Sequence, residues 1–158
     1  MFLKRMYFTI FLITQILISE TISGKVVKVK DGDTIDILIG KTIYVLRLEG
    51  IDAPENDQDF SSKSKQFVSD FCFGKTVRAE YKEKDRYRRY LAKVYINDKC
   101  LNEELLRTGM AWHYKYFNKE ARLANLEDYA RKNRIGLWSH PNPIPPWEFR
   151  KRKSNRRK

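Results

Sequence analysis

The sequence predicts an α+β fold that is mainly β, with a five-stranded barrel and about three helices. Five short segments alternate apolar with polar residues, a pattern typical of strands that bury one face. Three other segments repeat apolar residues at helical spacing or end at a glycine, as helices do. A chain of 158 residues is the size of one domain with a sizeable core.

Three strands are expected in the first part of this domain. They occupy residues 24–30, 34–39 and 43–48. In the first strand we expect Val27 and Val29 to face inward, because lysines alternate with them. The second and third strands are joined by the turn Gly40-Lys41, so we expect them to pair as a hairpin.

The remaining segments complete the order strand, strand, strand, helix, strand, strand, helix. After a loop at residues 56–62, an amphipathic helix that carries Phe67 and Phe71 stops at Gly74. The later strands and helices are expected at residues 77–82, 92–96, 101–108 and 120–134. This order is compatible with a five-stranded OB-fold barrel that carries extra helices.

Residues 1–23 are predicted to be a secretory signal peptide. Lys4 and Arg5 precede an apolar run of thirteen residues, which is short for a membrane span but typical of a signal. Small residues follow, so we expect processing just before Gly24, with an uncleaved anchor or a buried strand as alternatives. The mature protein would then be secreted or periplasmic, without a stable membrane span.

Basic residues exceed acidic ones, with 32 Lys and Arg against 20 Asp and Glu and a formal charge of +12. Without residues 1–23, which hold Lys4, Arg5 and Glu20, 30 basic and 19 acidic residues remain, for a charge of +11. Such an excess favours polyanionic partners, usually nucleic acid or an anionic surface. Charge alone does not choose between them.

A Pro-rich extension and basic tail at residues 141–158 follow the predicted domain at residues 24–140. Four prolines favour an extended segment carrying Trp147 and Phe149, which we expect to pack on the domain. Residues 150–158 include seven basic side chains, and we expect them to be disordered when unbound. They form either a non-specific arm for nucleic-acid phosphates or a solubilising tail.

The chain has two cysteines, Cys72 and Cys100. In an exported protein they could form a disulfide, or they could be two separately buried thiols. The two histidines, His113 and His140, are too few to favour a histidine-based metal site, and each is expected to be a packing or surface residue.

The strongest candidate for a site lies between residues 31 and 55. Hairpin pairing brings Asp31-Gly32-Asp33 near Asp52-Ala53-Pro54-Glu55, with Arg47 beside them. Carboxylate oxygens suit a hard divalent cation such as Ca²⁺, and an arginine fork suits a phosphate. Each piece alone has a plainer explanation, since Asp-Gly is a common turn and a lone arginine is usually solvated. Together, their spacing favours a site.

These and several later motifs resemble the staphylococcal nuclease (thermonuclease) family. The matching segments follow the family's order over about residues 24–138. They are DGDT at 31–34, RL at 47–48, GIDAPE at 50–55, DRYRR at 85–89, NE and LL at 102–106, GMAW at 109–112 and GLW at 136–138. The resemblance implies the family's five-stranded OB-fold barrel.

The resemblance also implies a Ca²⁺-dependent nuclease that hydrolyses phosphodiester bonds of DNA and RNA with little sequence specificity and leaves 3′-phosphorylated ends. We expect it to be a monomer. One Ca²⁺ would be held by Asp33 and Asp52, with Asp31 completing the shell directly or through water. The backbone carbonyl of Ala53 is a further ligand implied by the resemblance.

Catalytic roles are implied in the same way for three residues. Glu55 would act as the general base or position the attacking water. Arg47 and Arg89 would grip the phosphate from two sides, for which the fork geometry of arginine matters more than charge alone.

Substrate contacts are expected from residues near these. Arg86 and Tyr87 would hold a neighbouring phosphate and sugar. Tyr116 or Tyr114 would match the family's nucleotide-binding tyrosines, since stacking tolerates any base. Packing in the core or at its rim is the alternative, and for Tyr114 we favour it.

The chain departs from the family at Arg88, where the family usually has glycine. If this turn needs a positive φ, an arginine is strained there by ~1 kcal/mol and could re-aim Arg89. Alternatively, an ordinary backbone conformation suffices and Arg88 adds a phosphate contact.

Two functions of other classes compete with the nuclease. A nucleic-acid-binding OB-fold module without catalysis would bind regardless of chelators. A basic protein for an anionic surface would depend on residues 150–158 and not on Asp33.

Overall fold

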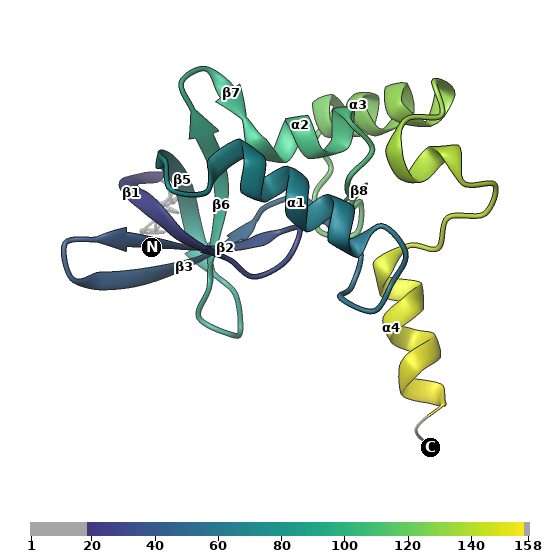
Figure 1. The fold of residues 1–158 in the computed structure, drawn as a ribbon, viewed down its shortest axis with the longest axis horizontal. Helices are drawn as coiled ribbons and strands as arrows, with labels where there is room; N and C mark the ends of the chain where they lie inside the picture. The colour runs from purple at the N-terminus through teal and green to yellow at the C-terminus, as the bar shows by residue number, and fades with distance from the viewer. Residues whose placement is uncertain (1–18, 157–158) are drawn as a thin grey trace, which may run out of the picture.

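Five strands close into a barrel in the computed structural model, which describes residues 19–156 (Figure 1). The strands are β1 (Glu20–Val29), β2 (Thr34–Ile39), β3 (Thr42–Leu48), β5 (Thr76–Lys84) and β6 (Tyr90–Ile96). They are hydrogen-bonded in the order β3-β2-β1-β5-β6, and β6 returns to β3 in parallel. The predicted α+β, mainly β fold with an OB-like barrel is therefore confirmed.

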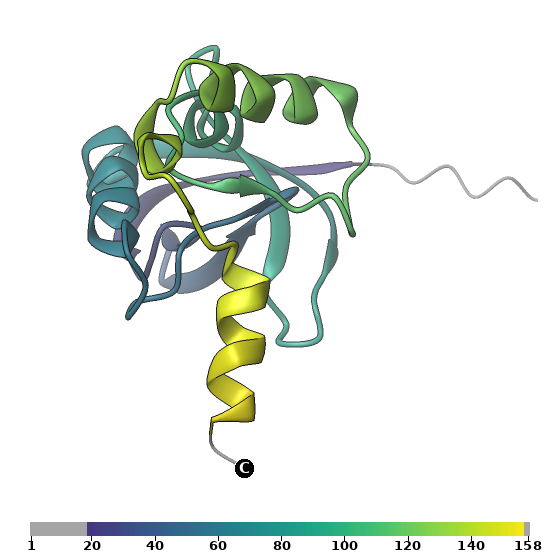
Figure 2. The same cartoon turned by 90° about the vertical axis from the view of Figure 1, so that its right-hand side faces the viewer.

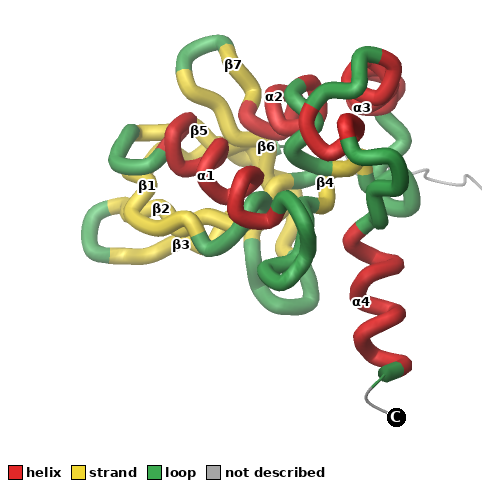
Figure 3. Tube along the Cα trace, turned by 45° about the vertical axis from the view of Figure 1, so that its right-hand side comes forward, coloured by secondary structure: helices red, strands yellow, loops and turns green. Residues whose placement is uncertain are grey.

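Shorter strands and helices complete the chain. The short strands are β4 (Ile51–Asp52), β7 (Lys99–Cys100) and β8 (Trp112–His113). The helices are α1 (Ser61–Cys72), α2 (Leu101–Arg107), α3 (Ala121–Lys132), the 3₁₀ turn η1 (Gly136–Ser139) and α4 (Pro146–Asn155). Helix α2 contacts both α1 and α3, whereas α4 extends away from the other elements (Figures 2 and 3).

The core fills the barrel and the space beneath α1 and α2. Strand side chains such as Ile35, Ile37 and Leu46 are fully buried, as are Leu101 and Leu105 of α2. Burying such side chains is the main favourable contribution to folding, at about 1.5–3 kcal/mol each. Ile35 and Ile37 of β2 therefore contribute directly to this core.

Strand β1 departs from the predicted alternation. Val26 is fully buried, whereas Val27 is 37% exposed, so the expectation that Val27 faces inward is wrong. The pairing of β1 with β2 shifts register between Val26 and Lys28. A bulge inserts one residue and reverses which side chains face inward, while Val29 still packs against the core.

The C-terminal segment also differs from its prediction. Residues 146–155 form helix α4, and the expectation of an extended, then disordered segment is wrong for this part. Pro146 stands at the start of the helix, where its fixed φ suits the backbone and its missing N–H is not needed. The predicted packing of Trp147 on the domain is confirmed by its contact with Trp112.

The predicted signal peptide lies largely outside the described residues. Its last four residues, 20–23, belong to β1 and pair with β5, so processing before Gly24 would remove part of a barrel strand. Among the described residues, no helix has the length and apolar character needed to cross a membrane.

Both cysteines are free and buried. Burial raises the pKa of the Cys72 thiol to about 12 and raises that of Cys100 as well. Of the two alternatives left open by the sequence, the structure has the separately buried thiols.

We expect both thiols of the folded protein to be unreactive, because thiolate formation is suppressed and access is blocked. Ellman's reagent should react slowly with the native protein and should report two thiols after unfolding in guanidinium without reductant. Fast native labelling, or fewer than two thiols in the unfolded protein, would contradict this arrangement.

Candidate active site

Arg47, at the end of β3, joins the two aspartates of the predicted site. Its Nη2 atom lies 3.0 Å from Asp33 Oδ2 and 3.0 Å from Asp52 Oδ1. Its Nη1 atom donates to the carbonyls of Leu48 at 2.7 Å and Ile51 at 2.9 Å. The side chain is 12% exposed, and a charge so nearly buried needs such partners. Arg47 thus brings Asp33 and Asp52 to one point, as the sequence predicted.

Asp33 is held in place by the turn between β1 and β2. Its Oδ2 accepts the backbone N–H of Ala53 at 2.8 Å, and its Oδ1 accepts the hydroxyl of Thr34 at 3.0 Å. A Cβ on Gly32 would lie 2.0 Å from Ser64 Oγ and 2.7 Å from Ala53 Cβ. Only glycine therefore lets helix α1 and the residues after β4 approach this turn.

Asp31 lies at the start of the same turn. Its Oδ1 accepts the backbone N–H of Asp33 at 2.9 Å. Burial, followed by the negative charge of Asp33, raises the pKa of Asp31 to about 6. Burial also raises the pKa of Asp52, although a hydrogen bond from Arg150 opposes this effect. Crowded, partly desolvated carboxylates of this kind are frequent at functional sites.

Glu55, which follows β4, is connected to Asp52 through a residue that the sequence did not single out. Arg150 of α4 places Nη1 2.6 Å from Glu55 Oε1 and Nη2 2.9 Å from Asp52 Oδ2. The side chain of Glu55 is 36% exposed, against 3% for Asp52. Solvent water therefore reaches Glu55 more easily than Asp52.

Arg89 approaches the same group from the turn between β5 and β6. Its Nη1 lies 3.5 Å from Thr34 Oγ1, and that hydroxyl donates to Asp33. Asp85 holds the guanidinium with contacts of 2.8 Å to Nε and 2.7 Å to Nη2. Although burial acts in the opposite direction, these hydrogen bonds keep the pKa of Asp85 below its usual value.

Arg88 has a φ of 64°, so this turn does adopt the conformation that favours glycine. Of the two alternatives, the strained one is observed. Arg89 is nevertheless anchored, since both its backbone N–H and its Nε donate to Asp85.

The residues predicted to contact the substrate lie at two separate places on the surface. Arg86 and Tyr87 are in the same turn as Arg89. The guanidinium carbons of Arg86 and Arg89 lie 4.8 and 5.4 Å from the centre of the Tyr87 ring. Tyr116 is 80% exposed and contacts the Phe117 ring. It borders a separate hollow that Trp147 also lines, and no contact joins it to the carboxylates among the described residues.

The donor set fits a hard cation only in part. Asp33 and Asp52 are buried carboxylates that already share one cationic nitrogen of Arg47. Within residues 19–156, however, no three or more His, Cys, Asp or Glu side chains form a group suited to a metal ion. Two aspartates with a backbone carbonyl remain suitable in type for Ca²⁺, and the role of Asp31 stays a prediction.

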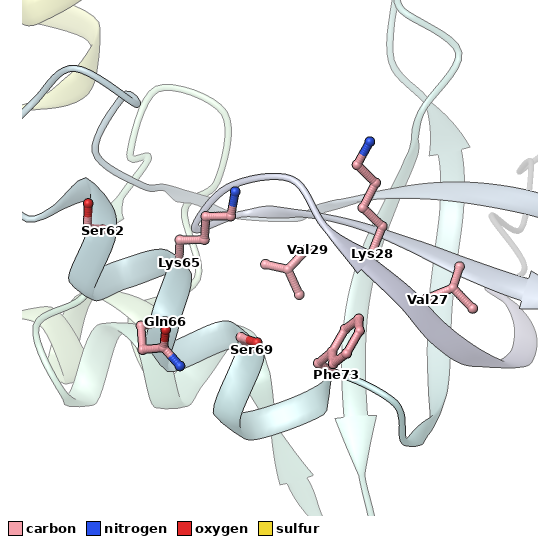
Figure 4. A pocket seen from close by; sticks show the side chains of 8 residues that line it. All are labelled: Val27, Lys28, Val29, Ser62, Lys65, Gln66, Ser69 and Phe73. Carbon is pink, nitrogen blue, oxygen red and sulfur yellow. The ribbon is translucent and has the colours of Figure 1, made fainter.

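A groove between β1 and α1 is a second hollow on the surface (Figure 4). Val29, Ser69 and Phe73 line it, with Lys28 and Lys65 beside it. None of the predicted site residues and no acidic side chain contributes to it, so it lacks the chemistry of the carboxylate group.

Similarity to known proteins shows to which family this chain belongs. The model for the family described as staphylococcal nuclease homologue matches residues 45–140. An Escherichia coli O157:H7 protein named "Uncharacterized endonuclease" is 41% identical over 133 residues, which cover 84% of this chain and 87% of that protein. The chain belongs to the staphylococcal nuclease family. A Shigella flexneri protein named "Micrococcal nuclease" is 39% identical over 143 residues, which cover 84% and 82% of the two chains.

A more distant relative is longer than this chain. "Staphylococcal-like nuclease CAN1" of Arabidopsis thaliana is 39% identical over 110 residues, which cover 70% of this chain and 34% of that protein. Membership of the staphylococcal nuclease family identifies this protein as a nuclease, a hydrolase whose substrates are nucleic acids.

Arg150 is the site residue that the sequence did not predict. Helix α4 determines its position, and the sequence did not predict this helix because four prolines at and before its start favoured an extended segment. Pro146 directly before Trp147 was the available signal, because proline is favoured at the first position of a helix.

Gly32→Ala should destabilise the protein by about 1–3 kcal/mol, since the new methyl overlaps Ser64 and Ala53. Urea unfolding measures this. Gly40→Ala is the control, because its methyl meets nothing and only its φ of +60° costs about 1 kcal/mol. Equal losses in the two variants would show that crowding at Gly32 is unimportant.

Arg88→Gly should raise the free energy of unfolding by about 0.5–1 kcal/mol, because glycine relieves the positive φ. The neighbouring change Arg86→Gly has no such strain to relieve and should be neutral or destabilising. Thermal and urea unfolding compare them, and a loss of stability in Arg88→Gly would contradict the strain.

Proposed function

We propose that this nuclease is an exported, monomeric, Ca²⁺-dependent enzyme that cleaves DNA and RNA with little sequence specificity and leaves 3′-phosphorylated ends. The observation that carries the proposal is the shared contact of Asp33 and Asp52 with Arg47, next to the partly exposed Glu55. A carboxylate pair, an arginine and an accessible base are the groups that phosphodiester hydrolysis requires.

Glu55 is assigned the role of general base or of positioning the attacking water. Its exposed side chain can accept a proton from an attacking water or hold that water in line. Asp33 and Asp52 are unsuited to this task, because both are buried away from water.

Arg47 and Arg89 are assigned to the phosphate. Arg47 contacts Asp33 directly, and Arg89 is connected to Asp33 through the hydroxyl of Thr34. Carboxylates fix the orientation of both guanidinium groups. Fixed donors stabilise the charge that develops on a phosphoryl oxygen without having to reorganise during the reaction. Arg47 would exchange one of its present contacts for the phosphate.

Ca²⁺ would be held by Asp33 and Asp52, with the carbonyl of Ala53 and the carboxylate of Asp31 as further oxygen donors. When bound, it supplies Lewis-acid polarisation of the phosphate. The chemistry of the donors supports this choice, since flexible oxygen shells suit Ca²⁺ better than Mg²⁺.

Low sequence specificity is supported by the kind of contacts available. The +12 formal charge favours phosphate backbones, and exposed rings such as Tyr87 and Tyr116 can stack on any base. Export rests on the sequence of residues 1–23, and the 3′-phosphate ends rest on the resemblance to the family.

Plasmid DNA and a structured RNA should both be degraded with Ca²⁺ and spared with EGTA. Glu55→Ala should lower the rate by roughly 10²–10⁴-fold, the usual contribution of a general base. Glu80→Ala is a matched control, because Glu80 of β5 is also a partly exposed carboxylate, 35% against 36% for Glu55. Products should prime a polymerase only after phosphatase treatment.

Full activity in EGTA would contradict the Ca²⁺ requirement. An active Glu55→Ala variant would contradict the role given to that carboxylate, and direct priming by untreated products would contradict the 3′-phosphate ends.

A further inference from the structure

Helix α4 brings a third arginine to the carboxylates, from outside the barrel. Arg150 Nη1 lies 2.6 Å from Glu55 Oε1, and Nη2 lies 2.9 Å from Asp52 Oδ2. One guanidinium therefore bridges the proposed base and a proposed cation ligand. Burial acts to lower the pKa of Arg150, but hydrogen bonds to Asp52 and Glu55 raise it overall, so the side chain stays charged.

Arg150 and Arg47 together occupy both oxygens of Asp52. Oδ1 accepts Arg47 Nη2 at 3.0 Å and Arg150 Nη1 at 3.3 Å, and Oδ2 accepts Arg150 Nη2 at 2.9 Å. Asp52 is 2% exposed, so it offers little further surface to a ligand. A divalent cation at these oxygens would also be repelled by the guanidinium at close range.

We propose that Arg150 is an exchangeable partner of the active site that competes with Ca²⁺ for Asp52. Asp52 accepts the cation only after the guanidinium of Arg150 has turned away. This inference rests on the proposed function, because it concerns the carboxylate assigned there to the cation.

The exchange requires only the side chain to move. The start of α4 is anchored, since the Trp147 ring stacks on Tyr114 at 5.4 Å and meets Trp112 edge-on at 5.7 Å. Gln58 Nε2 also donates to the carbonyl of Ile144, just before the helix. The Arg150 side chain is 42% exposed. Helix α4 itself extends away from the barrel (Figure 2).

The same helix provides a matched control. Lys153 lies one turn beyond Arg150, is 46% exposed and pairs with Asp57, which is not among the proposed cation ligands. Lys153→Gln and Arg150→Gln each remove one positive charge from the same helix at similar exposure. They differ in the contacts that are removed: Arg150→Gln removes those to Asp52 and Glu55, whereas Lys153→Gln removes one to Asp57.

Calorimetric titration of the folded full chain with CaCl₂, after removal of divalent ions, tests the competition. Arg150→Gln should bind Ca²⁺ roughly three- to tenfold more tightly than the wild-type protein, since a competing charge-assisted contact has been removed. Lys153→Gln should change the affinity less than twofold. Arg150→Lys, which keeps the charge without the fork, should lie between wild type and Arg150→Gln.

Equal affinities of wild type and Arg150→Gln would overturn the competition while leaving the Ca²⁺ site intact. An equal gain in Lys153→Gln would also overturn it, because the effect would then be general charge repulsion. Absence of Ca²⁺ binding in every variant would instead refute the proposed cation site, and the competition with it. If Arg150→Gln does not fold, the comparison of Arg150→Lys with Lys153→Gln decides in the same way.

Discussion

The contact of one guanidinium with two buried carboxylates is the constraint on which the site depends. Arg47 lies between Asp33, in the turn before β2, and Asp52, at the end of β4. Both aspartates are nearly inaccessible to water. Two adjacent carboxylates repel each other, and this repulsion is offset by a cation between them. Arg47 supplies it here, and it also fixes the chain between β3 and β4 through two carbonyls.

The barrel explains why these groups meet. The hairpin of β2 and β3 pairs Thr34 with Arg47, so the turn that carries Asp33 lies opposite the end of β3. Closure of β3 on β6 pairs Arg47 with Leu91, which brings the turn of Arg89 to the same end. Strand pairing thus places residues from two separate turns and from the end of β3 around one point.

Much of this arrangement follows from the sequence, because local patterns determine hairpins and their ends. The convergence of Asp33, Asp52 and Arg47 was predicted from two alternating strands and one turn. The inward face of β1 was predicted wrongly, because a bulge between Val26 and Lys28 changes which side chains face the core. Arg150 was missed because its position depends on the packing of Trp147 between Trp112 and Tyr114, which are distant in sequence.

We propose that Asp33 and Asp52 form a single cation site beside Arg47 and Glu55. A crystal structure of the full chain grown with CaCl₂, using anomalous scattering to locate the ion, tests it most directly. We expect one Ca²⁺ bound by the carboxylates of both aspartates. An ion bound elsewhere, or an Asp52 that still contacts only arginines in saturating Ca²⁺, would contradict it.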